Sequence, residues 1–229
     1  MYVKIAVVAN HERYHSVFQE LTNELEHEVY WIDKKEDLQK ERLLEMNPRY
    51  VFFLHWSYII PSEIYNHFES VIFHMTDVPF GRGGSPLQNL ISRGIYETKI
   101  TALKCEKDLD AGPVYMKKPL SLFGNAEEIY VRAAKTIKDM IINIIEHQPT
   151  PIKQEGEPVL FQRRKPKDGD ISQLKTIEQV FDYIRMLDAD GYPKAFIEIG
   201  EFRLEFERCS LKPDHIHADV KIRKRKDVT

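Results

Sequence analysis

Cysteine is scarce in this 229-residue chain, which contains only Cys105 and Cys209. The two residues lie far apart and belong to no Cys-x-x-Cys pair, so the pattern excludes a disulfide framework and does not support a structural zinc site. We interpret both as small buried hydrophobic residues and expect no metal site.

Long apolar runs and a strong net charge are also absent. No stretch approaches the ~18 uninterrupted apolar residues of a membrane-spanning helix, and the first residues lack a signal-peptide pattern. We therefore expect a cytoplasmic protein with no membrane partner. The formal net charge of −3 argues against a dedicated nucleic-acid binder, and we interpret the basic stretch 221–229 as a solvated strand end.

Short β-branched strands alternate with amphipathic helices along the first part of the chain. Buried strands separated by helices indicate a mostly parallel sheet with helices on both faces, because parallel strands need crossover connections. The pattern therefore predicts a Rossmann-like α/β domain. Its predicted strands are 3–10, 28–33, 49–56, 70–75, 98–106 and 113–122, and its predicted helices are 15–26, 35–47, 61–68, 86–94 and 125–148.

Two helix starts carry capping signals. Ser16 with Gln19 and Asn125 with Glu128 have the spacing of a capping box, in which each side chain binds a backbone N–H of the first turn. We expect the helix that begins at Asn125 to be the longest and to pack on the sheet.

The composition changes at 148–158, where prolines and a glycine predict a linker. We therefore predict a catalytic domain at 1–150 and an accessory unit at 151–229, with a helix at 176–187 and a three-stranded β-meander. Its first two strands should turn at Gly200 and Glu201. Such a small sheet is not stable alone, so its apolar residues should pack on the main sheet's edge or on a second subunit.

A histidine followed by a loop is the first candidate for chemistry. His74 ends an apolar strand, and ligands of open parallel sheets bind beyond the carboxyl ends of the strands. Pro79, Gly81, Gly83 and Gly84 allow the following backbone to approach a ligand closely. Arg82 either anchors an anion or holds the loop.

Asp110 is the second candidate. It begins an Asp-Ala-Gly-Pro turn after another strand of the same sheet. A carboxylate beside an imidazole can orient the ring and form an acid/base pair with it. The residues alone also allow a structural histidine at position 74 and a turn-forming aspartate at position 110.

The stretch from Ile72 to Pro113 resembles the core of the folate-dependent formyltransferases, whose motif is Asn-x-His-x-Ser-x-Leu-Pro, then Arg-Gly, then Leu-Asp-x-Gly. The matching residues stand in the same order in this chain, with a weaker likeness over the first 150 residues. They are His74, Thr76, Val78, Pro79, Arg82, Gly83, Pro86, Gly94, Thr101 and the run Leu109-Asp110-Ala111-Gly112.

The resemblance implies transfer of a formyl group from 10-formyltetrahydrofolate to an amine, with His74 and Asp110 as catalytic residues. It also implies a pterin pocket walled by the segment 55–61, in which Trp56 and Tyr58 could stack on the ring. The residues that it assigns to the folate are Trp56, Tyr58, Ile60, Met75, Thr76, Pro79, Arg82, Gly83 and Asp108.

One position departs from the family motif, because Ile72 stands where the family has asparagine. Loss of such an oxyanion donor typically costs about a hundredfold to a thousandfold in turnover. Asn10, at the end of the first strand, and His55, at the end of the third, are the candidate replacements. Alternatively, Asn10 caps the following turn, and His55 forms a hydrogen bond with a backbone carbonyl oxygen.

The acceptor amine is inferred from what flanks the motif. The segment 7–16 has no glycine, which argues against the glycinamide ribonucleotide branch and its phosphate loop. After the linker, 16 basic against 15 acidic residues argue against a tRNA substrate. A short core followed by a compact hairpin unit resembles the sugar N-formyltransferases. This resemblance implies a nucleotide-linked amino sugar as substrate, bound at Asn10, Arg163 and Arg164, no nucleic-acid partner, and a homodimer.

Three other activities remain open at this stage. They are a methionyl-tRNA formyltransferase-like enzyme, a relative that binds folate without turnover, and an enzyme that hydrolyses the formyl group with the same His74 and Asp110.

Overall fold

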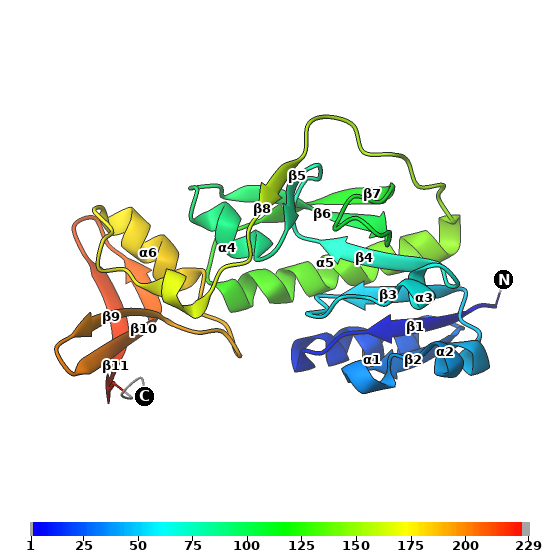
Figure 1. Ribbon diagram of the computed structural model, residues 1–229, viewed down its shortest axis with the longest axis horizontal. Helices are drawn as coiled ribbons and strands as arrows, with labels where there is room; N and C mark the ends of the chain where they lie inside the picture. The colour runs from blue at the N-terminus through cyan, green and yellow to red at the C-terminus, as the bar shows by residue number, and fades with distance from the viewer. Residues whose placement is uncertain (1, 226–229) are drawn as a thin grey trace. The chain divides into compact units, whose positions relative to one another are not determined.

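The computed structural model describes residues 2–225 (Figure 1). The chain divides into two compact units. The first unit consists of Met1–Gly83, Thr98–Leu120 and Val131–Leu160, and the second consists of Gly84–Glu97, Ser121–Tyr130 and Phe161–Thr229. Each unit is assembled from separate stretches of the chain, and the domain boundary at 150 stays a prediction.

The first unit is built on a six-stranded sheet within the described residues, with strand order β2-β1-β3-β4-β6-β7. The pairs β1–β2, β1–β3 and β3–β4 are parallel, whereas β4 and β6 are antiparallel. The predicted α/β class with a mostly parallel sheet is therefore confirmed. The strands are β1 Lys4–Val8, β2 Glu28–Ile32, β3 Tyr50–Leu54, β4 Ser70–His74, β6 Glu97–Lys104 and β7 Val114–Ser121.

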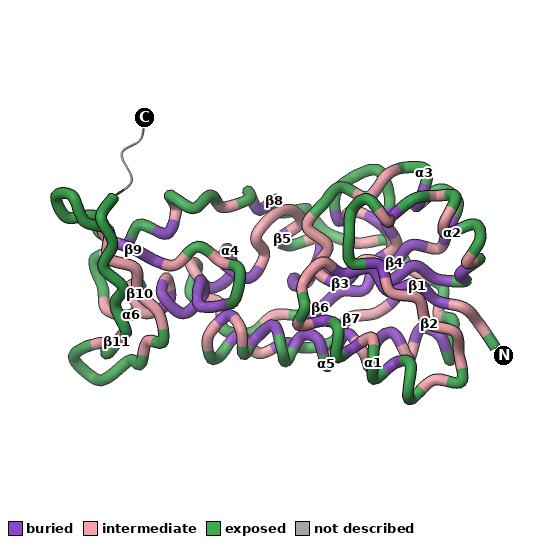
Figure 2. The backbone as a smooth tube through the Cα atoms, turned by 90° about the horizontal axis from the view of Figure 1, so that it is seen from below, coloured by how far each residue is buried: buried purple, intermediate pink, exposed green. Residues whose placement is uncertain are grey.

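Helices cover both faces of this sheet, because its central strands are apolar on both sides. Figure 2 shows α1 (His15–Glu24) and the part of α5 (Ala126–His147) after Val131 on one face, and α2 (Lys40–Met46) and α3 (Ser62–Tyr65) on the other. The second face has a buried core of Ala6, Val8, Ile32, Leu38, Leu43, Val51, Phe53, Ile64 and Phe68.

The start of α1 differs from the prediction. A 3₁₀ turn, η1 (Glu12–Tyr14), runs directly into α1, so Ser16 lies inside the helix and not at its cap. Its hydroxyl donates to the carbonyl oxygen of Arg13 at 3.2 Å. The capping box predicted for Ser16 is therefore wrong.

The predicted helix 35–47 is divided in two. The 3₁₀ turn η2 (Lys35–Asp37) is followed by extended backbone at Gln39, with φ −117° and ψ 144°, and α2 begins at Lys40. The predicted helix 61–68 is also shorter, since α3 occupies Ser62–Tyr65.

The capping box at the start of α5 is confirmed. The Glu128 N–H donates to Asn125 Oδ1 at 2.9 Å, and the Asn125 N–H donates to Glu128 Oε2 at 2.8 Å. These bonds satisfy two backbone donors that the first turn of a helix cannot pair internally. No helix in the part of the chain that the structure describes is long and apolar enough to span a membrane.

The second unit contains α4 (Pro86–Ile91), α6 (Ile177–Arg185) and the predicted antiparallel meander of β9 (Ala195–Ile199), β10 (Phe202–Leu211) and β11 (Ile216–Lys224). Gly200, with φ 56°, and Glu201 form the predicted two-residue turn. Its buried Arg185 pairs with Asp182 at 2.7 Å and donates to the carbonyl oxygen of Leu122.

Two further short strands were missed at the sequence level. β5 (Phe80–Gly83) and β8 (Val159–Phe161) form a small sheet of their own. Glycine-rich and linker sequences carry no strand pattern, so only the pairing of these distant segments defines them.

Candidate active site

His74 is the last residue of β4, and its imidazole is held at Nε2. This atom donates a hydrogen bond of 2.7 Å to the carbonyl oxygen of Gly81, in β5. A carbonyl oxygen only accepts, so Nε2 carries a proton. The side chain is 8% exposed. The second ring nitrogen, Nδ1, faces Asp110.

Asp110 lies beside this imidazole. Its Oδ2 is 3.5 Å from His74 Nδ1 and accepts the backbone N–H of Gly83 at 2.9 Å. A separation of 3.5 Å is longer than an ordinary hydrogen bond of about 2.7–3.2 Å. The structure therefore brings the two predicted side chains into one pair, without a tight bond between them. Their catalytic role stays a prediction.

The route by which Asp110 reaches His74 is not the one we expected. In the antiparallel pair of β4 and β6, Thr101 lies opposite His74 and Lys104 lies opposite Val71. The carboxyl end of β6 is therefore level with the start of β4, and a shared carboxyl edge cannot explain the contact. The segment 105–113 between β6 and β7 instead carries Asp110 back to His74.

The pair lies on an identifiable face of the sheet. Ile72 packs against the core beneath α2 and α3. Since alternate residues of a strand point to the same side, His74 points from the same face of β4 as Ile72. The two groups therefore meet at the carboxyl end of β4, on the side of the sheet to which Ile72 points.

Gln154 fastens the segment that carries Asp110. Its Nε2 donates to the carbonyl oxygens of Asp110 and Gly112, both at 2.8 Å. Arg82 in turn donates from Nε and Nη2 to Gln154 Oε1, at 3.0 and 2.8 Å. Of the two roles considered for Arg82, the structure shows the one that holds the loop. Sequence reasoning missed Gln154 because a glutamine in a proline-rich linker belongs to no motif.

Asn10 and His55 lie at the carboxyl ends of β1 and β3. β3 lies between β1 and β4 in the sheet, so Asn10 is not on a strand adjacent to that of His74. Asn10 Nδ2 donates to Ser57 Oγ at 3.4 Å, while its Oδ1 is buried without a hydrogen-bond partner among the described residues. His55 has φ 49°, and its Nδ1 lies 3.5 Å from the hydroxyl oxygen of Tyr14.

Part of the segment 55–61, which follows β3, packs against the core. Trp56 and Ile60 pack against the core beneath α2 and α3. Trp56 also contacts Tyr58, with 5.2 Å between ring centroids, and its Nε1 is buried with no hydrogen-bond partner among the described residues. Tyr58 is 45% exposed, with Lys35 over its ring.

The other residues assigned to the folate differ in burial. Met75 and Thr76 are buried, and the hydroxyl of Thr76 donates to the Gly81 carbonyl oxygen at 3.3 Å. Pro79 is half-buried and follows a cis peptide bond, whereas the side chain of Asp108 is exposed. Their contacts with a folate stay predictions.

Comparison with solved structures identifies the family. A structure described as methionyl-tRNA formyltransferase from Clostridium thermocellum is 47% identical in sequence, with a TM-score of 0.95. The match covers 97% of this chain and 100% of that one. The chain belongs to the formyltransferase family. The predicted enzyme class and its co-substrate, 10-formyltetrahydrofolate, are thereby confirmed at the level of the family.

Two further matches concern parts of the formyltransferase chain. A family model described as the methionyl-tRNA formyltransferase C-terminal domain matches residues 166–223. The methionyl-tRNA formyltransferase of Wolbachia pipientis is 23% identical over 177 residues, which are 75% of this chain and 58% of that protein. The chain thus spans less than two thirds of the length of this curated relative.

The predicted amino-sugar substrate is wrong. A sugar N-formyltransferase from a Shewanella species has a TM-score of 0.70 but only 15% identity, which shows the fold alone. The relative at 47% identity and the C-terminal model are both described as methionyl-tRNA formyltransferase. These findings also overturn the expectation of no nucleic-acid partner, and the expected homodimer loses the sugar-branch likeness on which it rested.

The arginines assigned to a sugar nucleotide lie in the second unit of this formyltransferase. Arg164 donates to the carbonyl oxygen of Asp168, and its guanidinium lies 5.0 Å from the ring centroid of Tyr183. Arg163 is exposed, with its Cβ close against Gly84. Arg164 is therefore occupied within its own unit, which is a structural role that the charge pattern did not reveal.

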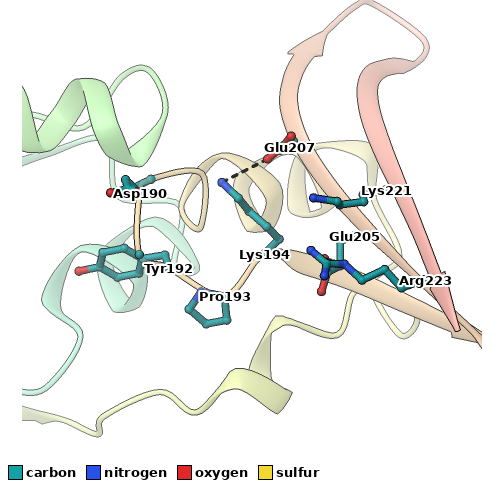
Figure 3. Close-up of a pocket in the computed structure, with 10 residues that line it drawn as sticks. Asp190, Tyr192, Pro193, Lys194, Glu205, Glu207, Lys221 and Arg223 are labelled. Atoms are coloured by element: carbon teal, nitrogen blue, oxygen red, sulfur yellow. Dashed lines mark ion pairs between the residues drawn. The ribbon is translucent and has the colours of Figure 1, made fainter. Parts of the chain in front are cut away.

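The second unit also contains a pocket of about 450 Å³ (Figure 3). Tyr192 and Pro193 come from the loop before β9, and Lys221 and Arg223 come from β11. Lys194 is paired across it with Glu207 at 3.5 Å. Arg223 is paired with Glu205 at 3.1 Å, and neither His74 nor Asp110 lines the pocket.

Proposed function

We propose that this formyltransferase transfers the formyl group of 10-formyltetrahydrofolate to the α-amino group of methionyl-tRNA. The observation that carries the proposal is the 47% identity to the Clostridium thermocellum protein over the whole of that chain. The match of residues 166–223 to a C-terminal domain model of the same description supports it.

The reaction sets three requirements. The amine nitrogen attacks the formyl carbon, negative charge develops on the formyl oxygen, and the bond from that carbon to N10 of the folate breaks. One amine proton must leave the attacking nitrogen, and one proton must reach N10. The co-substrate supplies the formyl group, so the protein has to orient the amine, move the proton and stabilise the charge.

The pair of His74 and Asp110 meets the proton requirement. The Gly81 carbonyl oxygen keeps a proton on His74 Nε2, which directs Nδ1 toward the carboxylate. In the proposed mechanism Asp110 accepts the amine proton and passes it to Nδ1 of His74, and Nδ1 delivers it to N10 of the folate as the bond from the formyl carbon to N10 breaks. The gap of 3.5 Å between Nδ1 and Oδ2 lets both atoms act on a third group without first breaking a strong bond.

Two buried polar atoms support a folate near the carboxyl ends of β1 and β3. Asn10 Oδ1 is an acceptor and Trp56 Nε1 is a donor, and neither has a hydrogen-bond partner among the described residues. An unpaired buried polar atom costs about 1–3 kcal/mol. A pterin carries donors and acceptors along one edge, so it has the groups that these two atoms lack.

Stabilisation of the formyl oxygen must come from a residue other than position 72, since Ile72 has no donor. We keep Asn10 and His55 as the candidate donors. Replacement of each by alanine distinguishes them, because loss of the true donor should lower turnover by about a hundredfold or more. Unchanged turnover in both variants would exclude both residues.

The test is a comparison of acceptors with the purified chain. In three separate reactions, the protein is incubated with 10-formyltetrahydrofolate and one acceptor: methionyl-tRNA, uncharged tRNA or a dTDP-linked 4-amino sugar. A mass gain of one formyl group should appear on methionine released from the charged tRNA and on neither other acceptor. Formyl transfer to the sugar, or folate binding with no transfer to any acceptor, would contradict the proposal.

The assignment of roles is tested in the same assay. His74→Ala and Asp110→Asn should lower turnover by about a hundredfold or more, because each removes a proton-transfer group. Glu106→Gln is the matched control, since Glu106 is an exposed carboxylate in the same segment as Asp110. If Asp110→Asn behaves like Glu106→Gln while both remain folded, the roles are misassigned.

A further inference from the structure

Two histidines beside the β10–β11 turn have a geometry that formyl transfer does not use. The Nε2 atoms of His215 and His217 lie 3.0 Å apart, and both side chains are exposed. They belong to the second unit, whereas His74 and Asp110 belong to the first.

The hairpin holds the two side chains on one side of the strand. The Lys212 N–H donates to the carbonyl oxygen of His215 at 2.8 Å and closes the turn at Pro213 and Asp214. His217 lies in β11, opposite Ser210 of β10. Residues two apart in extended backbone point the same way, so the hairpin presents both imidazoles together.

The separation of the nitrogens matches a chelate. Imidazole nitrogens bind transition metals at about 2.0–2.1 Å, so two ligands at 90° lie about 2.9 Å apart, and two at the tetrahedral angle lie about 3.3 Å apart. The observed 3.0 Å is nearer the 90° value. Tetragonal coordination by nitrogen and oxygen is typical of Cu²⁺ and Ni²⁺.

Asp214 prepares one of the two rings for this role. Its Oδ1 lies 2.6 Å from His215 Nδ1. A carboxylate accepts the Nδ1 proton, which leaves a lone pair on Nε2, toward His217. Metal-binding histidines commonly have such a carboxylate behind the ring, because it fixes the tautomer and the ring orientation.

We propose that His215 and His217 bind one Cu²⁺ or Ni²⁺ ion through their Nε2 atoms, with Asp214 as the positioning residue. No group of three or more His, Cys, Asp or Glu side chains within residues 2–225 is arranged to hold a metal ion. The hairpin therefore supplies two ligands, and water supplies the others. The other interpretation of the 3.0 Å contact is a hydrogen bond between two neutral rings.

The experiment is calorimetric titration of the intact protein with NiCl₂, and separately with CuCl₂, in a buffer that does not chelate metals. One ion should bind per chain with an affinity that His217→Ala and His215→Ala both abolish or greatly weaken. His147→Ala is the control, because His147 is an exposed histidine on α5 whose Nδ1 lies 3.1 Å from the Asn143 carbonyl oxygen. Circular dichroism confirms that each variant is folded.

Asp214→Asn tests the positioning role by itself. Both metal ligands remain, but the oriented carboxylate is lost, and affinity should fall about 10–100-fold. The electron paramagnetic resonance spectrum of bound Cu²⁺ should show two nitrogen ligands in the wild type and fewer in His217→Ala. Wild-type affinity in His217→Ala, or two nitrogens in its spectrum, would overturn the proposal. Formyl transfer should be unchanged in every variant, so the outcome is independent of the proposed function.

Discussion

At the scale of single residues, the position of Asp110 depends on hydrogen bonds from a residue outside its own segment. Gln154 uses both amide protons on backbone carbonyl oxygens around Asp110 and its oxygen on Arg82. The carboxylate position is thus set by a residue 44 positions away in the chain. This arrangement makes Gln154 a positioning residue for Asp110.

Replacement of Gln154 by alanine should therefore lower turnover. Loss of both hydrogen bonds lets the segment 105–113 shift, and a misplacement of about 1 Å can cost about a hundredfold in rate. We expect kcat for formyl transfer to fall by tenfold to a hundredfold, as an order of magnitude, with KM for methionyl-tRNA nearly unchanged.

The neighbouring Glu155→Gln is the control for this change, because Glu155 is exposed. Steady-state kinetics with both substrates measures the effect. An increase in KM with constant kcat would instead place Gln154 in substrate binding.

The two cysteines give a prediction that depends on pH. Burial, followed by the charge of Asp110, raises the pKa of Cys105 to about 12. Burial raises the pKa of Cys209 to about 11. Both thiols should stay protonated in the folded protein at pH 8 and react slowly with a thiol-specific reagent, because the thiolate is the nucleophile. Rapid labelling of two thiols without denaturant would contradict this.

The raised pKa values of the two thiols also determine whether the free energy of unfolding increases or decreases at high pH. A thiol whose pKa rises on folding stabilises the protein fully below its unfolded value of about 9. This contribution is lost as pH increases through that range toward the folded value. Urea unfolding midpoints should therefore decrease above pH 9 and decrease less in Cys105→Ala, measured relative to each protein's own midpoint at pH 8.

At the scale of elements, the two predicted helix starts differ in one testable way. Asn125 makes a capping box and Ser16 does not. Asn125→Ala should lower the free energy of unfolding by about 1 kcal/mol. Ser16→Ala should change it by less than about 0.5 kcal/mol, since the position is an exposed helix interior where alanine is favourable. Chemical denaturation of the two variants measures both values, and equal losses would contradict the assignment of the caps.

The loop that carries Asp110 depends on a second residue, Gly112. A Cβ atom at this position would lie 1.9 Å from the carbonyl oxygen of Lys104, so the backbone of the segment would have to move. Gly112→Ala should therefore destabilise the protein by about 1–3 kcal/mol, as overpacking typically does.

The same substitution should also lower formyl transfer, because the backbone shift displaces Asp110. Thermal unfolding and turnover are the two measurements. A variant with wild-type values for both would show that the close approach of Gly112 to Lys104 does not hold Asp110 in place.

At the scale of the whole molecule, the low net charge has to be reconciled with the proposed tRNA substrate. The chain has a formal net charge of −3 and only one excess basic residue over 151–229. Proteins that contact six to ten phosphates lose about 10³–10⁵ in affinity between 50 and 200 mM salt. We expect KM for methionyl-tRNA to increase by less than about 10³-fold over this range. A steeper dependence would show that this surface neutralises more phosphates than its charge count suggests.

The fold was largely predictable because its signals are local. Buried strands, the Asn125 capping box and the Gly200 turn depend on neighbouring residues, and all three were confirmed. The Ser16 cap failed because η1 extended the helix backwards. The prediction of an amino-sugar substrate was wrong because a charge count over 151–229 does not detect a match to the C-terminal domain model.

By itself, the sequence determined most of the strands and helices and identified His74 and Asp110 as candidate residues, since periodicity and motif order are properties of a linear chain. Tertiary structure decided how those residues meet. The segment 105–113 carries Asp110 from the end of the antiparallel β6 back to His74, and Gln154 and Arg82 hold it there. Such contacts join segments dozens of residues apart, and the free energy that selects them comes from packing and hydrogen bonds that exist only after the chain has folded.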